Sequence, residues 1–403
     1  MKKKYDVILY GASGFTGKQT VAYFLKTAPA SLKWAIAGRN QEKLSLVLRD
    51  LNIEPNRIDI IVADSQDSVA IDNMVRSTKV ILSTAGPYRL YGENIIASSA
   101  KHGVDYVDIT GETAFIRSMM DKYEAMAKKS GAKIIPFCGF DSIPSDIGVF
   151  ALCNHIQKKF FSLTDSVKGA FTIKGGLNGG TLHSMITMME TGDWEKMKDP
   201  TLLNSGLLEG VNFLDDTFDI HLDKSLNRWL APFVMGIINT RVVNRSAALF
   251  FKSKKPYGPN FSYSEYHNLG DWWNPISAFV MAKIQSGFNS FSQSPFVRSM
   301  MQKFGPAPSE GPSEITMNSG FFRLEMIGNA VGGQRATLTI SENGDPGNRA
   351  TVKFVCESAL ALALERDKLP GGKGLSGFLT PATGLGQVLI ERLIVAGVKF
   401  DYN

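Results

Sequence analysis

The sequence predicts a protein of the α/β class, with a doubly wound parallel sheet first and a second domain of α+β type after it. Short apolar runs alternate with segments of helical periodicity from Tyr5 to about Gly139, and a glycine-rich turn directly follows the first run. After Asp141 the rhythm changes to alternating strands, a pattern typical of an antiparallel sheet. These three observations define the expected architecture.

Residues 1–150 are expected to form the first domain. Its six apolar runs are Val7–Tyr10, Trp34–Ala37, Ile58–Ala63, Val80–Leu82, Tyr106–Ile109 and Lys133–Phe137. Apolar residues recur at helical spacing between them, in Phe15–Leu25, Glu42–Leu51, Ser68–Val75, Asn94–Lys101 and Phe115–Lys129. Each helix makes a right-handed crossover between parallel strands, so the expected strand order is 3-2-1-4-5-6.

Residues 151–349 are expected to form the second domain, which contains a mostly antiparallel sheet. Its clearest strands are Lys168–Lys174, Gly320–Ile327 and Arg335–Ser341. Residues 350–403 are predicted to hold two helices, Ala350–Glu365 and Pro381–Ala396, with Thr380 and Pro381 as the N-cap and first residue of the second. We expect these helices to pack back on the first domain.

The composition excludes several functional classes. The net charge is +6, but lysines and arginines are mixed with acids and form no basic stripe, so nucleic acid is not an expected partner. The three cysteines are far apart and contain no CxxC pair, which excludes a disulfide framework and a zinc site and fits a reducing cytoplasm. The five histidines show no metal-ligand spacing, and no metal is predicted.

Residues 228–296 are unusually rich in Trp, Phe, Met and Ile, chiefly in Arg228–Lys252 and Trp272–Phe296. Buried helices at an interdomain contact explain this composition, and peripheral membrane contact or a groove for an acyl chain is the alternative. No window approaches the roughly 20 apolar residues of a membrane span. The expected location is therefore the cytoplasm, with peripheral membrane association and a homodimer as open alternatives.

A glycine motif, Gly11-Ala-Ser-Gly-Phe-Thr-Gly17, stands between the first strand and the first helix. In this position the three glycines permit a tight turn, the approach of backbone N–H groups to a pyrophosphate, and close packing of the helix on the strand. The motif predicts a dinucleotide site of the Rossmann type, in which the phosphates lie at the helix N-terminus. Its expected cofactor contacts are Gly11, Ser13, Gly14, Phe15, Thr16 and Gly17.

The end of the second strand indicates NADPH rather than NADH. Arg39 stands where an NAD enzyme carries an acid, and a guanidinium can pair with the 2′-phosphate that a carboxylate would repel. Asn40 and Lys43 are expected to assist. Asp64, after the third strand, is placed either to meet the adenine amino group or to cap the strand end.

Polar clusters also follow the fourth, fifth and sixth strands, and the carboxyl ends of parallel strands line one crevice. Thr84, Ala85, Gly86 and Pro87 are expected to contact the cofactor beside the glycine motif, where the nicotinamide should lie. Tyr88, Glu112 and Asp141 are the candidate catalytic residues, with Tyr88 first, as proton donor or stabiliser of a developing enolate. Each also has a structural explanation, because the tyrosine can pack its ring and the acids can cap helices or turns.

These motifs resemble the saccharopine dehydrogenase-like oxidoreductases, which include the trans-acting enoyl reductases of mycobacterial lipid synthesis. The resemblance is carried by Gly11–Gly17, Ala37–Arg39, Thr84–Tyr88, Tyr91–Glu93, Asp105–Glu112 and Cys138–Asp146, with shorter matches at Gly175–Gly176, Gly179–Thr181 and Thr380–Ala382. It implies a dinucleotide-binding domain, an α+β domain and chemistry in the cleft between them.

The apolar middle of the chain favours a substrate with an enoyl or other unsaturated lipid-type group. A saccharopine-like amino-acid dehydrogenase and a non-catalytic NADPH-binding, membrane-associated scaffold remain the alternatives. His183, which follows a glycine-rich stretch, is a further candidate for a substrate contact.

Overall fold

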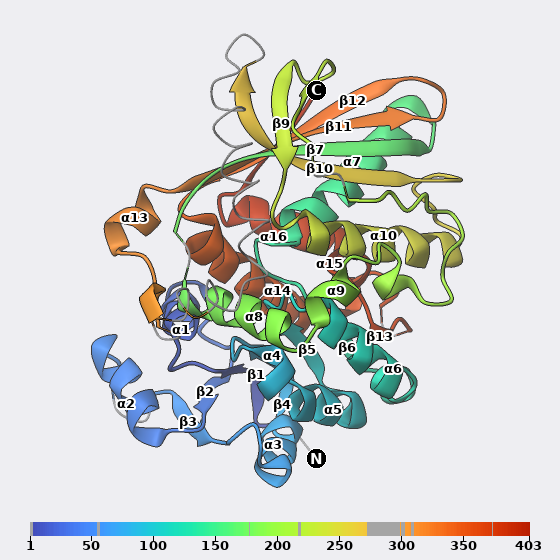
Figure 1. Cartoon of the computed structure of the whole chain (residues 1–403). Coiled ribbons are helices and arrows are strands. Elements are labelled where there is room, and N and C mark those ends of the chain that lie inside the picture. Colours follow the sequence, from blue (N-terminus) through green and yellow to red (C-terminus); the bar gives the residue numbers. More distant parts are fainter. Residues whose placement is uncertain are drawn as a thin grey trace.

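The computed structural model describes residues 3–54, 57–176, 178–216, 219–271, 299, 303–307, 310–372 and 374–403. Two seven-stranded sheets, here called sheet A and sheet B, lie in separate layers with helices between and around them (Figure 1). Trp272–Phe296, one half of the apolar segment, lies outside the described residues. In the described part of the chain, no helix combines the length and apolarity that crossing a membrane requires.

Sheet A contains only parallel strands. They are β1 (Tyr5–Tyr10), β2 (Trp34–Gly38), β3 (Asp59–Val62), β4 (Thr78–Ser83), β5 (Asp105–Asp108), β6 (Lys133–Ile135) and β13 (Gly377–Phe378). Their order is β13-β6-β5-β4-β1-β2-β3, which confirms the predicted order 3-2-1-4-5-6 and adds a short strand from the C-terminal region at one edge. The sixth strand ends earlier than predicted because Phe137 adopts a left-handed conformation with φ of 66°.

Helices cover both faces of sheet A. Those of the crossovers are α1 (Phe15–Thr27), α2 (Gln41–Asp50), α3 (Ser68–Arg76), α4 (Tyr88–Tyr91), α5 (Glu93–His102) and α6 (Thr113–Ser130). A helix from the C-terminal region, α14 (Thr351–Glu365), packs against α1 and against β1, β4 and β5. It therefore lies between the two sheets, as Figure 1 shows.

Sheet B is mostly antiparallel. Its strands are β7 (Thr164–Lys174), β8 (His221–Asp223), β9 (Arg228–Pro232), β10 (Ser262–Asp271), β11 (Phe321–Ala330), β12 (Arg335–Asn343) and β14 (Lys399–Tyr402). Their order is β14-β12-β11-β7-β10-β9-β8, and β7 pairs with β10 in parallel while the other neighbours are antiparallel. Phe171, Phe322 and Leu324 are fully buried where this sheet meets the helices below it.

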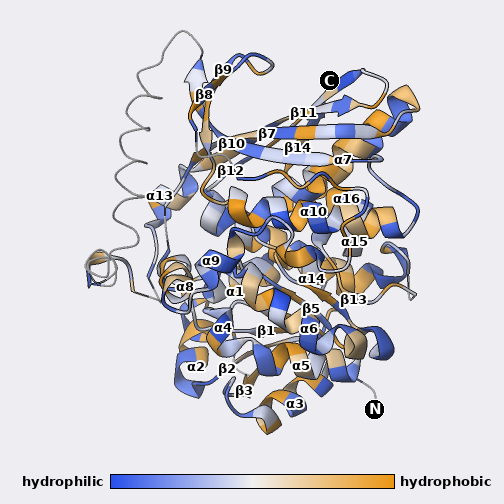
Figure 2. Ribbon diagram, turned by 45° about the vertical axis from the view of Figure 1, so that its right-hand side comes forward, coloured by the Kyte–Doolittle hydropathy of each residue, from blue (hydrophilic) through white to orange (hydrophobic). Residues whose placement is uncertain are grey.

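The remaining helices lie between the sheets or along their margins. They are α7 (Ile143–Phe160), α8 (Gly179–Glu190), α9 (Asp193–Met197), α10 (Gly236–Lys252), α13 (Glu314–Asn318), α15 (Pro381–Gly384) and α16 (Gly386–Val395). Short helical turns occupy Leu202–Asn204, Pro346–Ala350 and Arg366–Lys368. The hydrophobic colour in Figure 2 gathers on the helices between the two sheets, where the largest buried cluster lies.

Two expectations change in the second half of the chain. The predicted helix Pro381–Ala396 is divided into α15 and α16, because Gly386 has a φ of 51° that interrupts the helix. The apolar run Arg228–Lys252 forms β9 and α10, and most of the apolar side chains of α10 are buried. In this half of the segment the apolar residues therefore pack inside the protein.

Candidate active site

The glycine-rich loop between β1 and α1 is held in a tight turn. A Cβ at Gly17 would lie 2.1 Å from the carbonyl oxygen of Gly11, so only glycine lets α1 begin this close to the turn. A Cβ at Gly14 would meet only that same oxygen, at 3.4 Å, which leaves open space beside this residue. No side chain caps the first turn of α1. Its N–H groups thus face the space that a phosphate would need.

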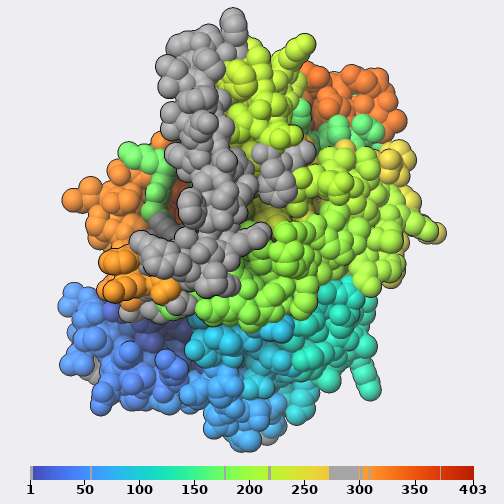
Figure 3. Space-filling model, in the orientation of Figure 1, coloured from blue at the N-terminus to red at the C-terminus, as the bar shows by residue number. Residues whose placement is uncertain are grey.

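The second domain approaches this loop from above. Ser13, Phe15 and Thr16 are half-buried, and Thr16 lines the cavity described below. The ring of Phe15 packs so closely on Gly311 that a Cβ there would lie 2.3 Å from a ring carbon. Figure 3 shows orange residues of the second domain resting against the blue N-terminal domain. The loop is thus covered in part by a segment almost three hundred residues away in sequence.

Arg39 and Asp64 lie at the carboxyl ends of β2 and β3 and are exposed. Burial raises the pKa of Tyr10, at the end of β1, to about 12, and the charges of Asp64 and Arg39 also act on this group. Arg39 forms no ion pair within the described part of the chain. The ends of these three strands therefore form one polar edge with a free guanidinium.

The other two residues predicted at this edge have local roles. The side chain of Asn40 caps α2 by accepting a hydrogen bond of 2.9 Å from the backbone N–H of Lys43. The side chain of Lys43 itself is exposed. Asp64 accepts a bond of 2.9 Å from the N–H of Gln66, which closes the turn after β3. For Asp64 this turn contact corresponds to the strand-end cap that was the alternative to a contact with adenine.

The loop after β4 lies directly beside the glycine loop. The N–H of Thr84 donates to the Tyr10 carbonyl at 2.9 Å, and a Cβ on Gly11 would lie 2.9 Å from the backbone nitrogen of Ala85. Thr84 and Gly86 both line the cavity. Pro87 is the residue that precedes α4. The structure thus joins the two loops at the point where the strand order reverses.

The hydroxyl group of Tyr88 is hydrogen-bonded to the backbone inside the protein. The side chain is 4% exposed, and its hydroxyl donates to the Ser83 carbonyl at 3.0 Å and accepts a longer bond of 3.4 Å from the Ile109 N–H. Burial raises the pKa of this hydroxyl well above its usual value. Its ring lines the cavity, but donating the proton to a substrate would require breaking the bond to Ser83.

Glu112 joins three segments with its carboxylate. One oxygen accepts from the Tyr88 N–H at 2.8 Å and from the Ser184 hydroxyl at 2.9 Å, and the other accepts from the Arg89 N–H at 2.8 Å. The residue is 1% exposed, and burial raises its pKa against the effect of these bonds. It is not among the residues that line the cavity. Glu112 caps α4 and ties the loop after β4 to α8.

Asp141, between β6 and α7, faces the cavity. Its carboxylate lies close to Gly111, where a Cβ would be 3.8 Å from Oδ2, and no hydrogen bond from the described part of the chain acts on it. Burial raises its pKa to about 7. Of the three candidate catalytic residues, Asp141 is the one whose acidic group is both unpartnered and in the cavity.

A buried network fixes the turn that carries Asp141. The hydroxyl of Ser142 donates to the Asn239 side-chain oxygen at 3.1 Å, and the amide of Asn239 donates to Glu265 at 2.7 Å. Glu265 also accepts from Ser145 at 2.6 Å, and burial raises its pKa to about 7. These contacts connect α7, α10 and β10 behind the cavity, so the position of Asp141 depends on elements of the second domain.

The cavity itself has a volume of about 500 Å³ and lies between the edge of sheet A and the second domain. Among the described residues, Asp141 and Lys174 are the two charged ones that line it, and most of the remaining lining is apolar. Residues that sequence reasoning missed come from α8 and from the junction of β9 and α10. They are Ser184, Met185 and Met188, and Phe233, Val234, Met235, Ile237 and Ile238. His183 is not among the lining residues.

The start of α8 is anchored to the turn before α14. Asp345 accepts a hydrogen bond from the Gly176 N–H and another of 2.8 Å from the Asn348 amide. Asn348 in turn accepts from the Asn178 amide at 2.9 Å, and Asn178 caps α8. A Cβ at Gly175 would lie 2.5 Å from the Asp345 carboxylate, so this close approach requires glycine. The paired glycines noted in the sequence therefore place α8 over the cavity.

Only part of this second wall left a signal in the sequence. The glycines of Gly175–Thr181 marked a segment facing the cleft, but nothing local indicated which face of α8 would line it. Asp345 and Asn348 gave no signal, because their partners are about 170 residues away. In the residues that the structure describes, no cluster of side chains suits a metal ion.

The fold has a counterpart among solved structures. The apo saccharopine dehydrogenase (L-Glu forming) of Saccharomyces cerevisiae superimposes with a TM-score of 0.55 and 13% identity, over 99% of each chain. The chain therefore has the fold of that enzyme, with a glycine-loop parallel sheet followed by an α+β second domain. No protein-family model matches the chain.

Sequence relatives give the narrower assignment. The trans-acting enoyl reductase of Mycobacterium tuberculosis (strain H37Rv) is 34% identical over 98% of this chain and 97% of that protein. The protein of the same name from Mycobacterium leprae is 33% identical over 98% of this chain and 97% of its own length. The chain belongs to the trans-acting enoyl reductase family.

Proposed function

We propose that this protein is an NADPH-dependent reductase of enoyl groups carried on apolar chains. The observation that carries the proposal is the cavity, which is mainly apolar, borders Thr84 and Gly86 at one wall and contains the unpartnered acid Asp141. An enoyl reductase needs these three features together, namely a cofactor edge, space for a hydrocarbon chain and a proton donor. The names of the sequence relatives support the same reaction.

The residues present fit a dinucleotide. The open space at Gly14 and the uncapped first turn of α1 suit a pyrophosphate, and Arg39 suits a 2′-phosphate. When bound, the cofactor supplies a hydride to the β-carbon of the enoyl group. Thr84 and Gly86 would border its reactive end, since both lie beside the glycine loop and line the cavity.

Asp141 is the group we assign to proton delivery. Below about pH 7 its carboxyl is protonated, and it faces a cavity in which no other lining residue that the structure describes is an acid. It donates its proton to the α-carbon as the double bond is reduced, and the resulting carboxylate is protonated again from solvent. Glu112 and Tyr88 support the loop after β4 in this scheme and do not exchange protons with the substrate.

The two alternatives from the sequence make different demands. A saccharopine-like amino-acid dehydrogenase binds a dicarboxylic substrate and needs several cationic groups, whereas in the described part of the chain Lys174 is the single cation lining the cavity. A non-catalytic NADPH-binding scaffold would need no proton donor in the cavity. The cavity lining therefore favours reduction of an apolar substrate over both.

The function is tested by following NADPH absorbance with enoyl thioesters of increasing chain length. We expect equimolar loss of NADPH and enoyl thioester, formation of the saturated thioester by mass spectrometry, and no NADPH loss with saturated thioesters. Cofactor binding without turnover of any enoyl substrate would favour the scaffold. NADPH oxidation that occurs only when an amino acid is added would favour the amino-acid dehydrogenase.

Replacing Arg39 by alanine is expected to weaken NADPH binding and leave NADH binding unchanged. Charge-assisted hydrogen bonds contribute about 1.5–3 kcal/mol, so their loss corresponds to roughly 10- to 100-fold in affinity. Calorimetric titration of both cofactors measures the change. Arg49→Ala, which removes an exposed cation from α2, is the matched control and should have little effect. Retention of the NADPH preference in Arg39→Ala would show that Arg39 does not read the 2′-phosphate.

A further inference from the structure

We propose that a trough formed by α8, α9 and the start of α10 holds the hydrocarbon tail of the substrate, and that Met188 and Trp194 limit its length. This inference rests on the proposed enoyl reductase function and adds to it the direction of the chain and the residues that select its length.

The wall on α8 is a single stripe of one helix face. Its cavity-lining residues are Gly180, Thr181, Ser184, Met185 and Met188, a spacing that returns to the same side of a helix every three to four residues. The stripe changes character along its length, because its first half is glycine, threonine and serine and its second half is two methionines. Seven residues at 1.5 Å each separate Thr181 from Met188, so the stripe is about 10 Å long.

A second wall of the cavity is also apolar. Phe233, Val234 and Met235 come from the turn between β9 and α10, and Ile237 and Ile238 come from the first turn of α10. Ile238 also reaches the reaction centre, since a Cβ on Gly111 would lie 2.9 Å from its Cδ1. The apolar wall therefore begins next to Gly111 and Asp141, and Ile238 belongs to the same buried cluster as Met188 of α8, with Met235 and Ile237 packed against that cluster.

This gradient gives the substrate a direction. The polar half of the stripe lies beside Lys174 and Asn178, which also line the cavity, and suits the carbonyl end of the chain. The methionine half, with Trp194 and Ile237, offers no hydrogen-bonding group except the indole N–H. A hydrocarbon chain needs no hydrogen bond there, and its transfer from water into these apolar surroundings is favourable in free energy. The tail thus points toward α9.

The end of the trough is held rigidly. Met188 is 7% exposed and belongs to the same buried cluster as Met197 and Leu203. Trp194 follows Asp193, which is 2% exposed and pairs with Lys196 at 3.0 Å and with Arg89 at 3.7 Å. Because Arg89 belongs to α4, the ion pair holds α9 against the first domain. In Figure 3 the yellow-green surface of this region rests directly on the blue domain.

The test measures binding of saturated straight-chain acyl thioesters by calorimetry in the presence of NADPH. Each methylene buried in the trough contributes about 0.8 kcal/mol, or roughly fourfold in affinity, until the trough is full. For the unaltered protein we expect affinity to rise by that factor per methylene and then stop at a limiting length. Met188→Ala and Trp194→Ala should each move the limit to longer chains, and Met188→Phe should move it to shorter ones.

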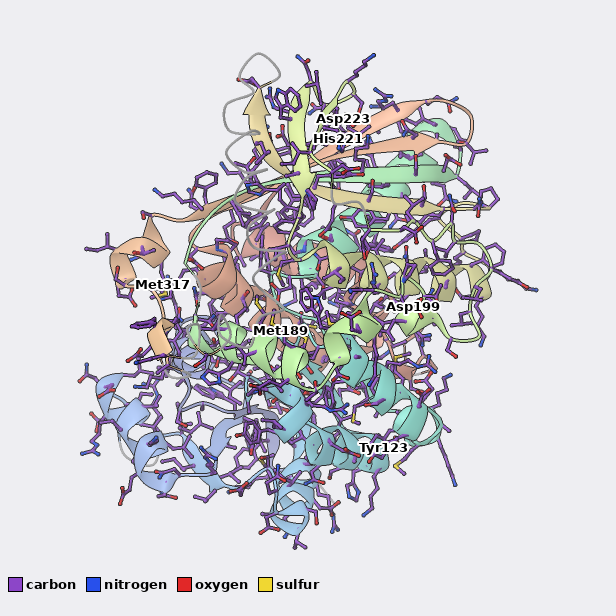
Figure 4. All side chains as sticks on the ribbon, viewed as in Figure 1. Tyr123, Met189, Asp199, His221, Asp223 and Met317 are labelled. Carbon is purple, nitrogen blue, oxygen red and sulfur yellow. The ribbon has the colours of Figure 1, made fainter. Side chains whose placement is uncertain are left out.

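Met189 provides the matched control. It is the neighbouring residue on α8, labelled in Figure 4, and it does not line the cavity. Met189→Ala should therefore leave the limiting length unchanged. The proposal is overturned if saturated thioesters do not bind. It is also overturned if the Met188 and Trp194 variants keep the far-UV circular dichroism of the parent and have the same limiting chain length as the parent. A shift of the limiting chain length in Met189→Ala as large as that in Met188→Ala would overturn it as well.

Saturated probes bind without reacting, which separates the two proposals. A limit that shifts as expected in a protein that reduces no enoyl thioester would support the tail trough and reject the reductase. Reduction of enoyl thioesters with an unchanged limit would do the reverse.

Discussion

Replacing Asp141 by asparagine is expected to lower the turnover of enoyl thioesters by about 10²- to 10⁴-fold while leaving NADPH affinity unchanged. The amide fills the same space but cannot donate the proton, and Asp141 is the single acid among the described residues that line the cavity. Single-turnover rates and cofactor titrations of the two proteins measure the two effects separately. Turnover within threefold of the parent would show that the proton comes from elsewhere.

The same carboxyl should give the reaction a pH dependence. Because burial raises the pKa of Asp141 to about 7, the protonated donor is lost as pH rises through 7, and turnover should fall over that range. Ionisation of this buried group also costs stability, since its folded-state pKa lies above the value of about 3.9 in an unfolded chain. Asp141→Asn should therefore melt at a higher temperature than the parent at pH 8, with the difference shrinking toward pH 4.

Glu112→Gln is the informative comparison for this pH profile. Its carboxylate accepts three hydrogen bonds, and an amide nitrogen in place of one oxygen would face a donor, so some loss of activity is expected. The fall of turnover near pH 7 should nevertheless persist in this variant. The opposite result would be a fall near pH 7 that is absent in Glu112→Gln and present in a residually active Asp141→Asn. That result would make Glu112, and not Asp141, the proton donor.

Replacing Gly17 by alanine is expected to weaken NADPH binding by roughly 100-fold or more and to lower the melting temperature. The added Cβ would lie 2.1 Å from the Gly11 carbonyl oxygen, so the turn or α1 must move away from its present position. Overpacking of this kind costs about 1–3 kcal/mol of stability. Displacement of two phosphate contacts of about 1.5 kcal/mol each accounts for the loss of affinity.

Gly14→Ala separates the two consequences. A Cβ at Gly14 would meet only one atom, at 3.4 Å, and would project into the space that we assign to the phosphates. We expect this variant to keep the melting temperature of the parent but to bind NADPH more weakly. Calorimetry and thermal denaturation of both variants make the comparison. Normal NADPH affinity in Gly17→Ala would place the dinucleotide outside this loop.

Much of the fold could be predicted from the sequence because its signals are local. The apolar runs, the helical periodicity between them and the turn at Gly11–Gly17 each lie within a few residues of the chain. Together they fixed the parallel sheet, its strand order and the two loops that meet beside Thr84. The change of rhythm after Asp141 likewise indicated the second, mostly antiparallel sheet.

Contacts between segments that are distant in the sequence could not be predicted from these local patterns. The strands β13 and β14 are short and complete the edges of the two sheets, which local pattern alone does not reveal. The face of α8 that lines the cavity depends on Asp345 and Asn348, about 170 residues away. The sequence placed Tyr88, Glu112 and Asp141 at one crevice, but it could not show which of their polar groups already have hydrogen-bond partners.

The three candidates differ in which of their polar groups already have partners in the described part of the chain. The Glu112 carboxylate accepts hydrogen bonds from Tyr88, Arg89 and Ser184, and the Tyr88 hydroxyl donates one to Ser83. The Asp141 carboxyl faces the cavity without such a partner in the described part of the chain. A residue type states only what a side chain can do. Whether its proton or lone pairs remain free for a substrate depends on which groups the fold brings within hydrogen-bonding distance, and only the tertiary structure decides that.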